Sequence, residues 1–514
     1  MMTLDVTVVN VALADIAGSL DVGLARVQWT VSAYSLAFGA LLLTAGALSD
    51  RIGRKTVFMA GMALFTVASA ACGLAPDAGT LIAARAAQGL GGSLVFAPSL
   101  ALLAAAYEGA RRQAAIAAFA AVASAAGALG PVVGGLFVSG PGWRWIFLVN
   151  VPIGVLAVAG ALARMPGAQA PPAAGAARRR VDPLGAVLAV AALLALHYPL
   201  TVGPEAGWTS PRVLLPAAAG IVLTAALVAV QRRGDGLIDL ALLRIRALSG
   251  AAVLGFLARM SSLGVLAFTT LWLQSTHAYS PLEVGLHLIP LTGSLLLAGL
   301  FVARLQRAFP PHALVAGGFA LQGLGLLALA AAASGAASGA AGSAAGAGPA
   351  GPGGAATAAG LVLLGIGGAV IFPPLMGVAV GAVPEDRAGL ASGLTNACYP
   401  LGTATGVAAF GALFAARLDA GLGGGLGGEL GAAADGPVRD AVGTGRLELL
   451  DPVLRPLARS AFSGAYTAVC LASAAVCLIG VLAARTLRDG AAGAGTAGGP
   501  AGKPAPAART AQTS

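Results

Sequence analysis

The feature that most constrains how this chain folds is the recurrence, from end to end, of apolar stretches of roughly 18 residues or more. Each stretch is long enough to cross about 30 Å of hydrocarbon as a helix. Only 10% of the residues are charged, whereas soluble domains average about 25%, so ordinary packing in water is excluded. A closed barrel would need alternating strands of about ten residues, and the sequence shows no such pattern. We therefore predict an all-α membrane protein.

Fourteen membrane-spanning helices are predicted, and this even number places both termini on the same side of the membrane. The first seven are expected at residues 4–20, 30–48, 57–74, 80–106, 114–138, 145–162 and 183–202. The second seven are expected at residues 213–230, 248–273, 284–303, 313–333, 358–383, 389–415 and 461–484.

Basic residues indicate the orientation, because cytoplasmic loops carry the excess of Lys and Arg. With both termini inside, 20 of the 30 Lys and Arg residues fall in inner loops and the tail, 8 in outer loops and 2 within helices. We therefore expect a multi-pass protein of the plasma (inner) membrane with both termini cytoplasmic. A net charge of +10 can also indicate a nucleic-acid partner. Here the charges lie in short loops between apolar spans, so the expected partner is the lipid bilayer and not nucleic acid.

Three segments are predicted to lie outside the helices. The outer loop 334–356 and the tail 490–514 are almost wholly small residues and Pro, and the tail is expected to be disordered. The long outer loop 417–459 is mixed and offers a short amphipathic helix near 446–457. The first helix follows no cationic leader, so it is not a cleavable signal peptide. Either this helix is short or the true start lies upstream, and we favour the second.

A distinctive loop, GALSDRIGRK, joins the second and third predicted helices. The small residue Gly46 is expected to let the helices approach closely, Asp50 to pair with basic groups or a helix end, and Gly53 to allow a tight reversal. The basic residues are expected to anchor at anionic headgroups. This loop resembles the signature cytoplasmic loop of the major facilitator superfamily, where it implies a role in conformational switching. The positions that carry the match are Gly46, Asp50, Arg51, Gly53, Arg54 and Lys55.

Three further stretches are similar to one branch of that superfamily, the fourteen-helix drug:proton antiporters. They are LDVTVVNVAL at 4–13, LIAARAAQGLGG at 81–92, and GALGPVVGG at 127–135 followed by WRWIFLVNVP at 143–152. Ala14 stands where the family usually has Pro. Shorter matches at 182–185, 207–208 and 387–393 extend the resemblance over nearly the whole chain. It implies export of drugs or antibiotics.

The fifth helix carries a face of small residues at Gly127, Gly130, Gly134 and Gly135. Such a face lets a neighbouring backbone pack closely. Pro131 is expected to kink the helix and free a carbonyl. Packing is the simplest role for this stretch, and a hinge is the alternative. The resemblance favours export, because symporters of the superfamily usually lack this motif.

Charged residues within a span cost about 2.5–3.5 kcal/mol on insertion scales and so mark function. The resemblance implies that Asp5 and Arg85 couple protons or contact substrate. Desolvation favours the protonated carboxyl of Asp5, and a nearby Arg favours the carboxylate. The alternatives are a hydrated Asp at the interface and an Arg satisfied by backbone carbonyls. Candidates for lining a cavity are Asn10, Gln88, Arg259 and His287.

The resemblance implies the major facilitator fold, with six-helix bundles in 1–163 and 248–489, two extra helices in 164–247, and the tail 490–514. The implied function is proton-coupled export of small lipophilic compounds by alternating access. A metabolite facilitator or symporter, and a transporter-like sensor without flux, are the alternatives.

The sequence gives no support to catalysis or to a bound metal. It holds no Walker loop, zinc-ligand spacing or nucleophile elbow, and its four cysteines lie singly within apolar segments. We expect no enzymatic activity, no metal and no cofactor, with protons as the coupling ion. The expected partner in solution is a small-molecule substrate, and the chain is expected to be a monomer.

Overall fold

The computed structural model describes residues 1–165, 182–232, 241–337, 352–384, 387–425, 441–447 and 450–487, and in these ranges every regular element is a helix. In the first half of the chain the helices are α1 (Met2–Ser19), α2 (Leu24–Ile52), α3 (Arg54–Gly73), α4 (Ala78–Ala106), α5 (Gly109–Ser139), α6 (Trp145–Leu148), α7 (Asn150–Arg164), α8 (Pro183–Ala206) and α9 (Pro211–Gln231). In the second half they are η1 (Leu242–Arg244), α10 (Arg246–His277), α11 (Pro281–His287), α12 (Ile289–Ala308), α13 (Pro311–Ala337), α14 (Pro352–Gly381), α15 (Ala388–Gly425) and α17 (Arg455–Ala483).

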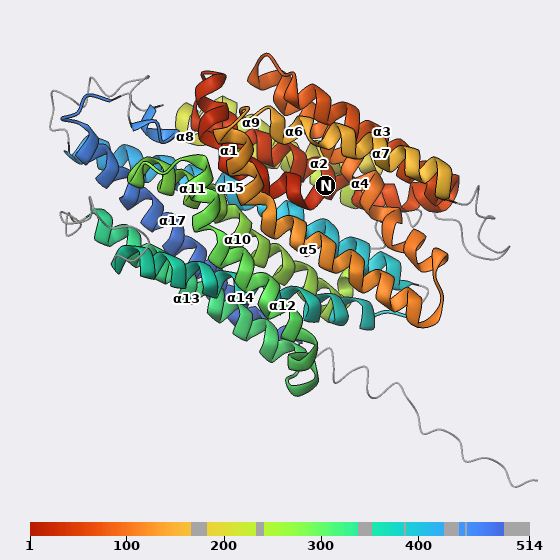
Figure 1. Ribbon diagram of the computed structural model, residues 1–514. Coiled ribbons are helices and arrows are strands. Elements are labelled where there is room, and N and C mark those ends of the chain that lie inside the picture. Colours follow the sequence, from red (N-terminus) through yellow and green to blue (C-terminus); the bar gives the residue numbers. More distant parts are fainter. Residues whose placement is uncertain are drawn as a thin grey trace, which may run out of the picture.

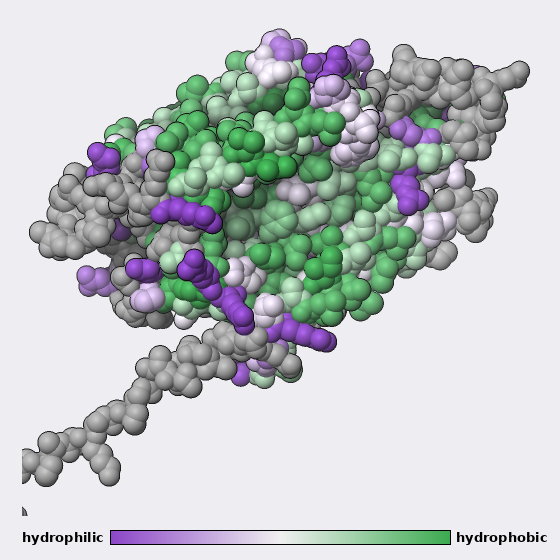
Figure 2. Space-filling model, turned by 180° about the vertical axis from the view of Figure 1, so that it is seen from behind, coloured by the Kyte–Doolittle hydropathy of each residue, from purple (hydrophilic) through white to green (hydrophobic). Residues whose placement is uncertain are grey.

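Most of these helices can cross a membrane. Among the described residues, 13 spans are long and apolar enough, with α6 and α7 forming one span and α11 and α12 another. The predicted fourteenth corresponds to α5, whose described apolar stretch covers Ala125–Ser139. Figure 2 shows hydrophobic side chains covering the middle of one face of the molecule, with hydrophilic side chains gathered toward its ends. This distribution fits a bundle surrounded by lipid.

The helices pack as two bundles, and α8 and α9 are inserted between them in the sequence (Figure 1). In the first bundle α4 packs against α2 and α3, and α1 packs against α5. In the second, α13 packs against α14 and α17, and α10 against α15. The two bundles meet where α2 contacts α15 and α5 contacts α11, while α8 packs against both α2 and α15. The predicted two-bundle architecture is confirmed.

Several helix boundaries differ from the prediction. The predicted sixth and tenth helices are each interrupted, at Val149 and Leu288. Each break comes just before a proline, Pro152 or Pro290, and a proline cannot donate a backbone hydrogen bond to the residue four positions earlier.

The long loop predicted at 417–459 is shorter than expected, because α15 continues to Gly425 and α17 begins at Arg455. Of the short helix expected near 446–457, residues 455–457 are helical as the first turn of α17, residues 452–454 form a turn, and residues 448 and 449 lie outside the described residues. Helices α13 and α14 reach to Ala337 and Pro352, so most of the predicted loop 334–356 lies outside the described residues, as does the tail 490–514.

Helix α1 begins inside the bundle and not at its surface. Figure 1 marks the N-terminus in the middle of the first bundle. The Sδ atom of Met2 lies 3.4 Å from where a Cβ on Gly92, near the middle of α4, would stand. Asp5, in the first turn of α1, is therefore buried at the height of the middle of the bundle.

Candidate functional site

Asp5 of α1 and Arg85 of α4 form an ion pair inside the first bundle. One terminal nitrogen of Arg85 donates to Oδ2 of Asp5, and each residue is only 1% exposed. The position of Arg85 follows from the start of α4, where the exposed Asp77 caps the helix by accepting the backbone N–H of Thr80 at 2.9 Å. This capping bond lowers the pKa of the Asp77 carboxyl. Arg85 lies about two turns further along the helix.

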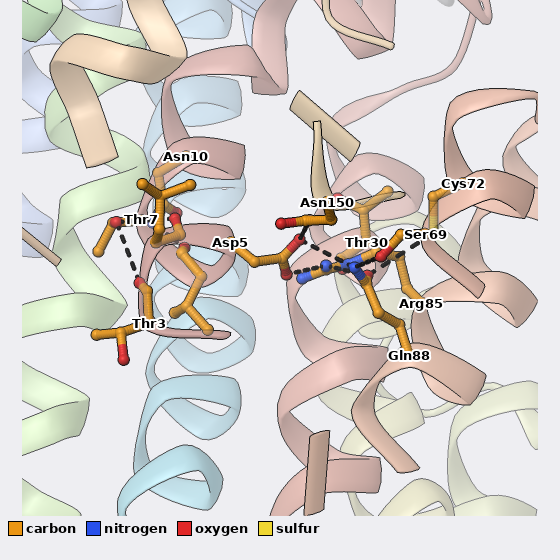
Figure 3. A network of polar contacts seen from close by, with 12 residues as sticks. Thr3, Asp5, Thr7, Asn10, Thr30, Ser69, Cys72, Arg85, Gln88 and Asn150 are labelled. Atoms are coloured by element: carbon orange, nitrogen blue, oxygen red, sulfur yellow. Dashed lines mark hydrogen bonds and ion pairs between the residues drawn. The ribbon is translucent and has the colours of Figure 1, made fainter. Parts of the chain in front are cut away.

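Three neutral side chains complete the surroundings of this ion pair (Figure 3). Gln88, one turn after Arg85 on the same face of α4, donates from Nε2 to Oδ1 of Asp5 at 3.0 Å and to Oγ of Ser69 at 2.8 Å. Asn150, at the start of α7, donates to the same Asp5 oxygen at 3.3 Å. The Asp5 carboxylate thus accepts hydrogen bonds from both α4 and α7. We call Asp5, Arg85, Gln88, Asn150 and Ser69 the Asp5 cluster.

Arg85 has further partners besides Asp5. Its Nε donates to the backbone carbonyl of Thr30 at 2.8 Å, and a terminal nitrogen donates to Oε1 of Gln88 at 2.6 Å. Its guanidinium carbon lies 4.4 Å from the centre of the Tyr34 ring. These contacts can hold the guanidinium in place if Asp5 takes up a proton, since none of them requires a negative charge on Asp5.

The charge balance of the Asp5 cluster depends on one proton. As drawn, the buried carboxylate and guanidinium neutralise each other, which offsets part of the cost of removing both charges from water. Protonation of Asp5 would remove the attraction and leave a buried positive charge. A change in the charge of Asp5 would therefore alter the force between α1 and α4.

The glycine face of α5 packs on two partners. A Cβ at Gly130 would overlap Oγ1 of Thr7 in α1, and one at Gly134 would stand 3.0 Å from the Val8 carbonyl oxygen. A Cβ at Gly127 would stand 3.1 Å from Thr3. The second partner is α11 of the other bundle, whose Pro281 carbonyl would be overlapped by a Cβ at Gly135.

The carbonyl of Pro131 also faces the second bundle. It lies 2.5 Å from where a Cβ on Gly285 of α11 would stand. Glycines on both helices therefore allow α5 and α11 to approach backbone to backbone at this interface. This contact is one of those that join the two bundles.

The loop between α2 and α3 has Gly53 at φ +101°, a conformation that side chains other than glycine rarely adopt. Asp50 and Arg54 form a half-exposed ion pair at 3.9 Å, and Lys55 donates to the carbonyl of Met165 after α7 at 2.6 Å. The expectation for Gly46 is not met. No atom lies within 4 Å of where its Cβ would be, so close helix packing does not require glycine there in this conformation.

The other predicted cavity residues are divided among different places. Gln88 belongs to the Asp5 cluster, but Asn10 lies apart from it (Figure 3) and donates to Val6 O at 3.1 Å. His287, at the end of the short helix α11, stacks on Tyr279, which precedes that helix, with ring centres 4.3 Å apart. Arg259 lies in α10, with its guanidinium carbon 4.3 Å from the centre of the Phe372 ring.

Two members of the Asp5 cluster and two of its neighbours were not predicted from the sequence. Asn150 occurs in a family-like motif but was given no role, and Ser69, Thr30 and Tyr34 were not singled out. Ser69 and Asn150 are fully buried polar residues, and a buried polar side chain within an apolar span was the available signal.

Comparisons with known proteins agree with this architecture. A family model described as Major Facilitator Superfamily matches residues 1–407. Multidrug resistance protein Stp of Mycobacterium tuberculosis is 35% identical over 413 residues, which cover 80% of this chain and 73% of that protein. The Methylenomycin A resistance protein of Streptomyces coelicolor is 34% identical, with 80% and 82% covered. The Tetracenomycin C resistance and export protein of Streptomyces glaucescens is 34% identical, with 80% and 73% covered.

Solved structures support the fold. A bacterial homolog to the human lysosomal transporter Spinster superposes with a TM-score of 0.63 at 17% identity, over 95% of each chain. The peptide-transporter-family protein PepTSo superposes with a TM-score of 0.58 at 12% identity. The chain therefore belongs to the Major Facilitator Superfamily, is related to drug and antibiotic resistance proteins of that superfamily, and is a multi-pass membrane transporter and not an enzyme.

Proposed function

We propose that this protein is a proton-coupled antiporter that exports small lipophilic compounds, drugs or antibiotics, across the plasma membrane. The observation that carries the proposal is the buried ion pair between Asp5 and Arg85, enclosed by neutral hydrogen-bonding side chains. A buried carboxylate beside a membrane-embedded Arg is costly to keep, so function is its default explanation. The names of the relatives, which include drug and antibiotic resistance proteins, support the same class of substrate.

A link between the proton site and the two bundles supports alternating access. Helix α1, which carries Asp5, also contacts α10 of the second bundle. Thr270 donates to the Asn10 carbonyl at 2.8 Å, and Gln274 donates to the Val11 carbonyl at 2.9 Å. A change in the force between Asp5 and Arg85 acts on the same helix that holds these two contacts. Proton uptake would thereby favour one arrangement of the bundles over the other.

The expected orientation places the loop 50–55 and the C-terminal tail in the cytoplasm, because this side carries most of the basic residues, and the first turn of α1 points toward the same side from within the bundle. Protons then enter from outside, where each charge moved down the potential contributes about 2.3 kcal/mol per 100 mV. We propose that the protein works as a single chain, since each bundle contributes helices to the same interface.

The test is flux through the purified protein in liposomes with an imposed pH gradient. Tetracenomycin C and methylenomycin A are suitable first compounds because relatives carry their names. An antiporter accumulates compound above equilibrium when the liposome interior is acid. Accumulation only when the exterior is acid would indicate a symporter. Equilibration of the compound at any pH would indicate a facilitator, and the absence of flux would indicate a sensor.

Asp5→Asn is the informative variant for the same assay, and Asp21→Asn is its matched control. Asp21 lies just beyond the other end of α1, is exposed, and approaches Arg446 only at 4.0 Å. Asp5→Asn should lose pH-driven accumulation while Asp21→Asn keeps it. Undiminished accumulation by Asp5→Asn, measured against protein-free liposomes, would exclude Asp5 as the proton carrier.

A further inference from the structure

The second bundle contains a cation, Arg259, that lacks a counterion among the described residues, whereas Arg85 in the first bundle has one. Arg259 lies near the middle of α10 and is half-buried. Its guanidinium carbon stands 4.3 Å from the centre of the Phe372 ring in α14 and 5.9 Å from that of Tyr399 in α15. Within the part of the chain that the structure describes, no carboxylate forms an ion pair with it. Arg85, by contrast, is paired with Asp5.

Aromatic faces do not fully replace a counterion. They attract the guanidinium through their quadrupoles, but they accept few of its five N–H donors, which are built to bind a planar pair of oxygens. Arg259 therefore retains donors that an anion could occupy.

A second unused donor lies beside Arg259. The hydroxyl oxygen of Tyr399 is buried and has no hydrogen-bond partner. The Tyr399 ring packs directly on Gly255, where any Cβ would overlap it. Gly255 is one turn before Arg259 on the same face of α10. The backbone of α10 thus positions the phenol next to the guanidinium, while the Phe372 ring stands 5.0 Å from the Tyr399 ring.

The face of α10 that carries Arg259 points toward the first bundle. Thr270 follows Arg259 by eleven residues, or about three turns, and so lies on the same face. Thr270 donates to the Asn10 carbonyl of α1 at 2.8 Å. Arg259 therefore lies on the side of α10 that contacts α1 about three turns further along, and its guanidinium stands among rings from α14 and α15.

We propose that Arg259 and Tyr399 bind a carboxylate on the exported compound, and that Phe372 and the Tyr399 ring contact its apolar body. This inference rests on the proposed export function and narrows its substrate class to lipophilic monoanions or zwitterions. Arg259 supplies the charge and two parallel N–H donors, and the Tyr399 hydroxyl supplies a third donor.

The test compares two lipophilic probes of the same skeleton, 1-pyrenebutyrate and 1-pyrenebutanol. The full-length protein is placed in nanodiscs of phosphatidylcholine, and binding is measured by equilibrium dialysis against protein-free nanodiscs. The protein should bind the carboxylate at least about tenfold more tightly than the alcohol, since hydrogen bonds to charged groups are the strong ones. Equal affinity for the two probes, or no binding of the carboxylate, would overturn the proposal.

Variants locate the preference on the named residues. Arg259→Gln should bind both probes equally. Arg259→Lys should keep part of the preference for the carboxylate because it keeps the charge. In Tyr399→Phe the ratio of the two affinities should fall by about threefold to tenfold. Tyr399→Phe changes one buried oxygen without a partner, so it should fold even if the Arg259 variants do not. A full preference in Tyr399→Phe and in Arg259→Gln would assign the carboxylate to another site.

This test fails or succeeds separately from the proposed function. Asp5→Asn should retain the preference for the carboxylate while losing pH-driven accumulation. Accumulation of compounds in liposomes without any carboxylate preference would leave the antiporter standing and remove the anion site. A carboxylate preference that depends on Arg259, without pH-driven flux, would support the anion site and contradict the antiporter.

Discussion

The buried charges of Asp5 and Arg85 are expected to compensate each other, and a double-mutant cycle tests this compensation. Asp5→Asn keeps the shape of the side chain but leaves Arg85 buried without its counterion. Arg85→Gln leaves the Asp5 carboxylate with only the amides of Gln88 and Asn150. The double variant removes both charges and places neutral hydrogen-bonding groups in their positions.

The magnitude follows from burial and from the remaining partners. Both members are 1% exposed, and removing one partner of a buried ion pair costs about 3–5 kcal/mol because the other charge stays uncompensated. The Tyr34 ring and the Thr30 carbonyl continue to hold Arg85, and a desolvated cation–π contact is worth about 2 kcal/mol. We therefore expect about 2–4 kcal/mol for Asp5→Asn. Arg85→Gln should cost more, because amide donors alone compensate the remaining carboxylate.

The assay is thermal unfolding of the purified protein in one detergent, followed with a thiol-reactive dye on the buried cysteines. The double variant should be destabilised by less than the sum of the single variants, with a coupling free energy of at least about 2 kcal/mol. This measurement does not depend on transport activity. Additive effects of the two substitutions would show that the two charges do not compensate each other.

Further predictions concern packing, switching and substrate charge. Gly130→Ala should destabilise the protein by about 1–3 kcal/mol through overlap with Thr7, measured by thermal unfolding. The control Gly293→Ala, with no atom within 4 Å of its Cβ, should be neutral or slightly stabilising; equal destabilisation by both would contradict the packing argument. Asp50→Ala should change stability by less than about 1 kcal/mol because its ion pair is half-exposed, yet should lower the turnover number with nearly unchanged substrate affinity. A large loss of affinity at normal turnover would instead place this loop in the binding site. Rigid dications such as chlorhexidine should not be exported, because a single acid cannot both carry a proton and neutralise two charges in a cavity of low polarity. Strong chlorhexidine resistance in an efflux-deficient host, lost with Asp5→Asn, would show this to be wrong.

The fold could be predicted from the sequence because a bilayer leaves the chain few choices. Each apolar stretch must form a helix to satisfy its backbone, so the number and order of the spans follow from hydropathy. The prediction ended one helix at residue 415 and began the next at 461, whereas α15 continues to Gly425 and α17 already begins at Arg455. Small residues such as those after Ala415 continue a helix or form a loop with little difference in free energy, and tertiary packing decides between them.

The candidate site was predictable only in part. The resemblance singled out Asp5 and Arg85, and their pairing is what the structure adds. Asn150 and Ser69 reach Asp5 and Gln88 from α7 and α3, and one sequence does not say which faces of distant helices meet. For Gly46 the sequence was misleading, since a small residue can stand where no neighbour approaches in the conformation observed.

Proton-coupled export is tested most directly by asking whether binding of an exported compound displaces a proton from Asp5. Antiport requires that compound and proton oppose each other's binding, and this coupling is reciprocal. The compound that accumulates in liposomes is added to the purified protein in weakly buffered detergent solution, across a series of pH values, with a pH-sensitive dye. If Asp5 carries the proton, the wild-type protein should release about one proton per bound molecule at some pH within the series. Asp5→Asn should release none at equal occupancy. Binding without proton release at any pH, or equal release from the wild-type protein and Asp5→Asn, would contradict this expectation.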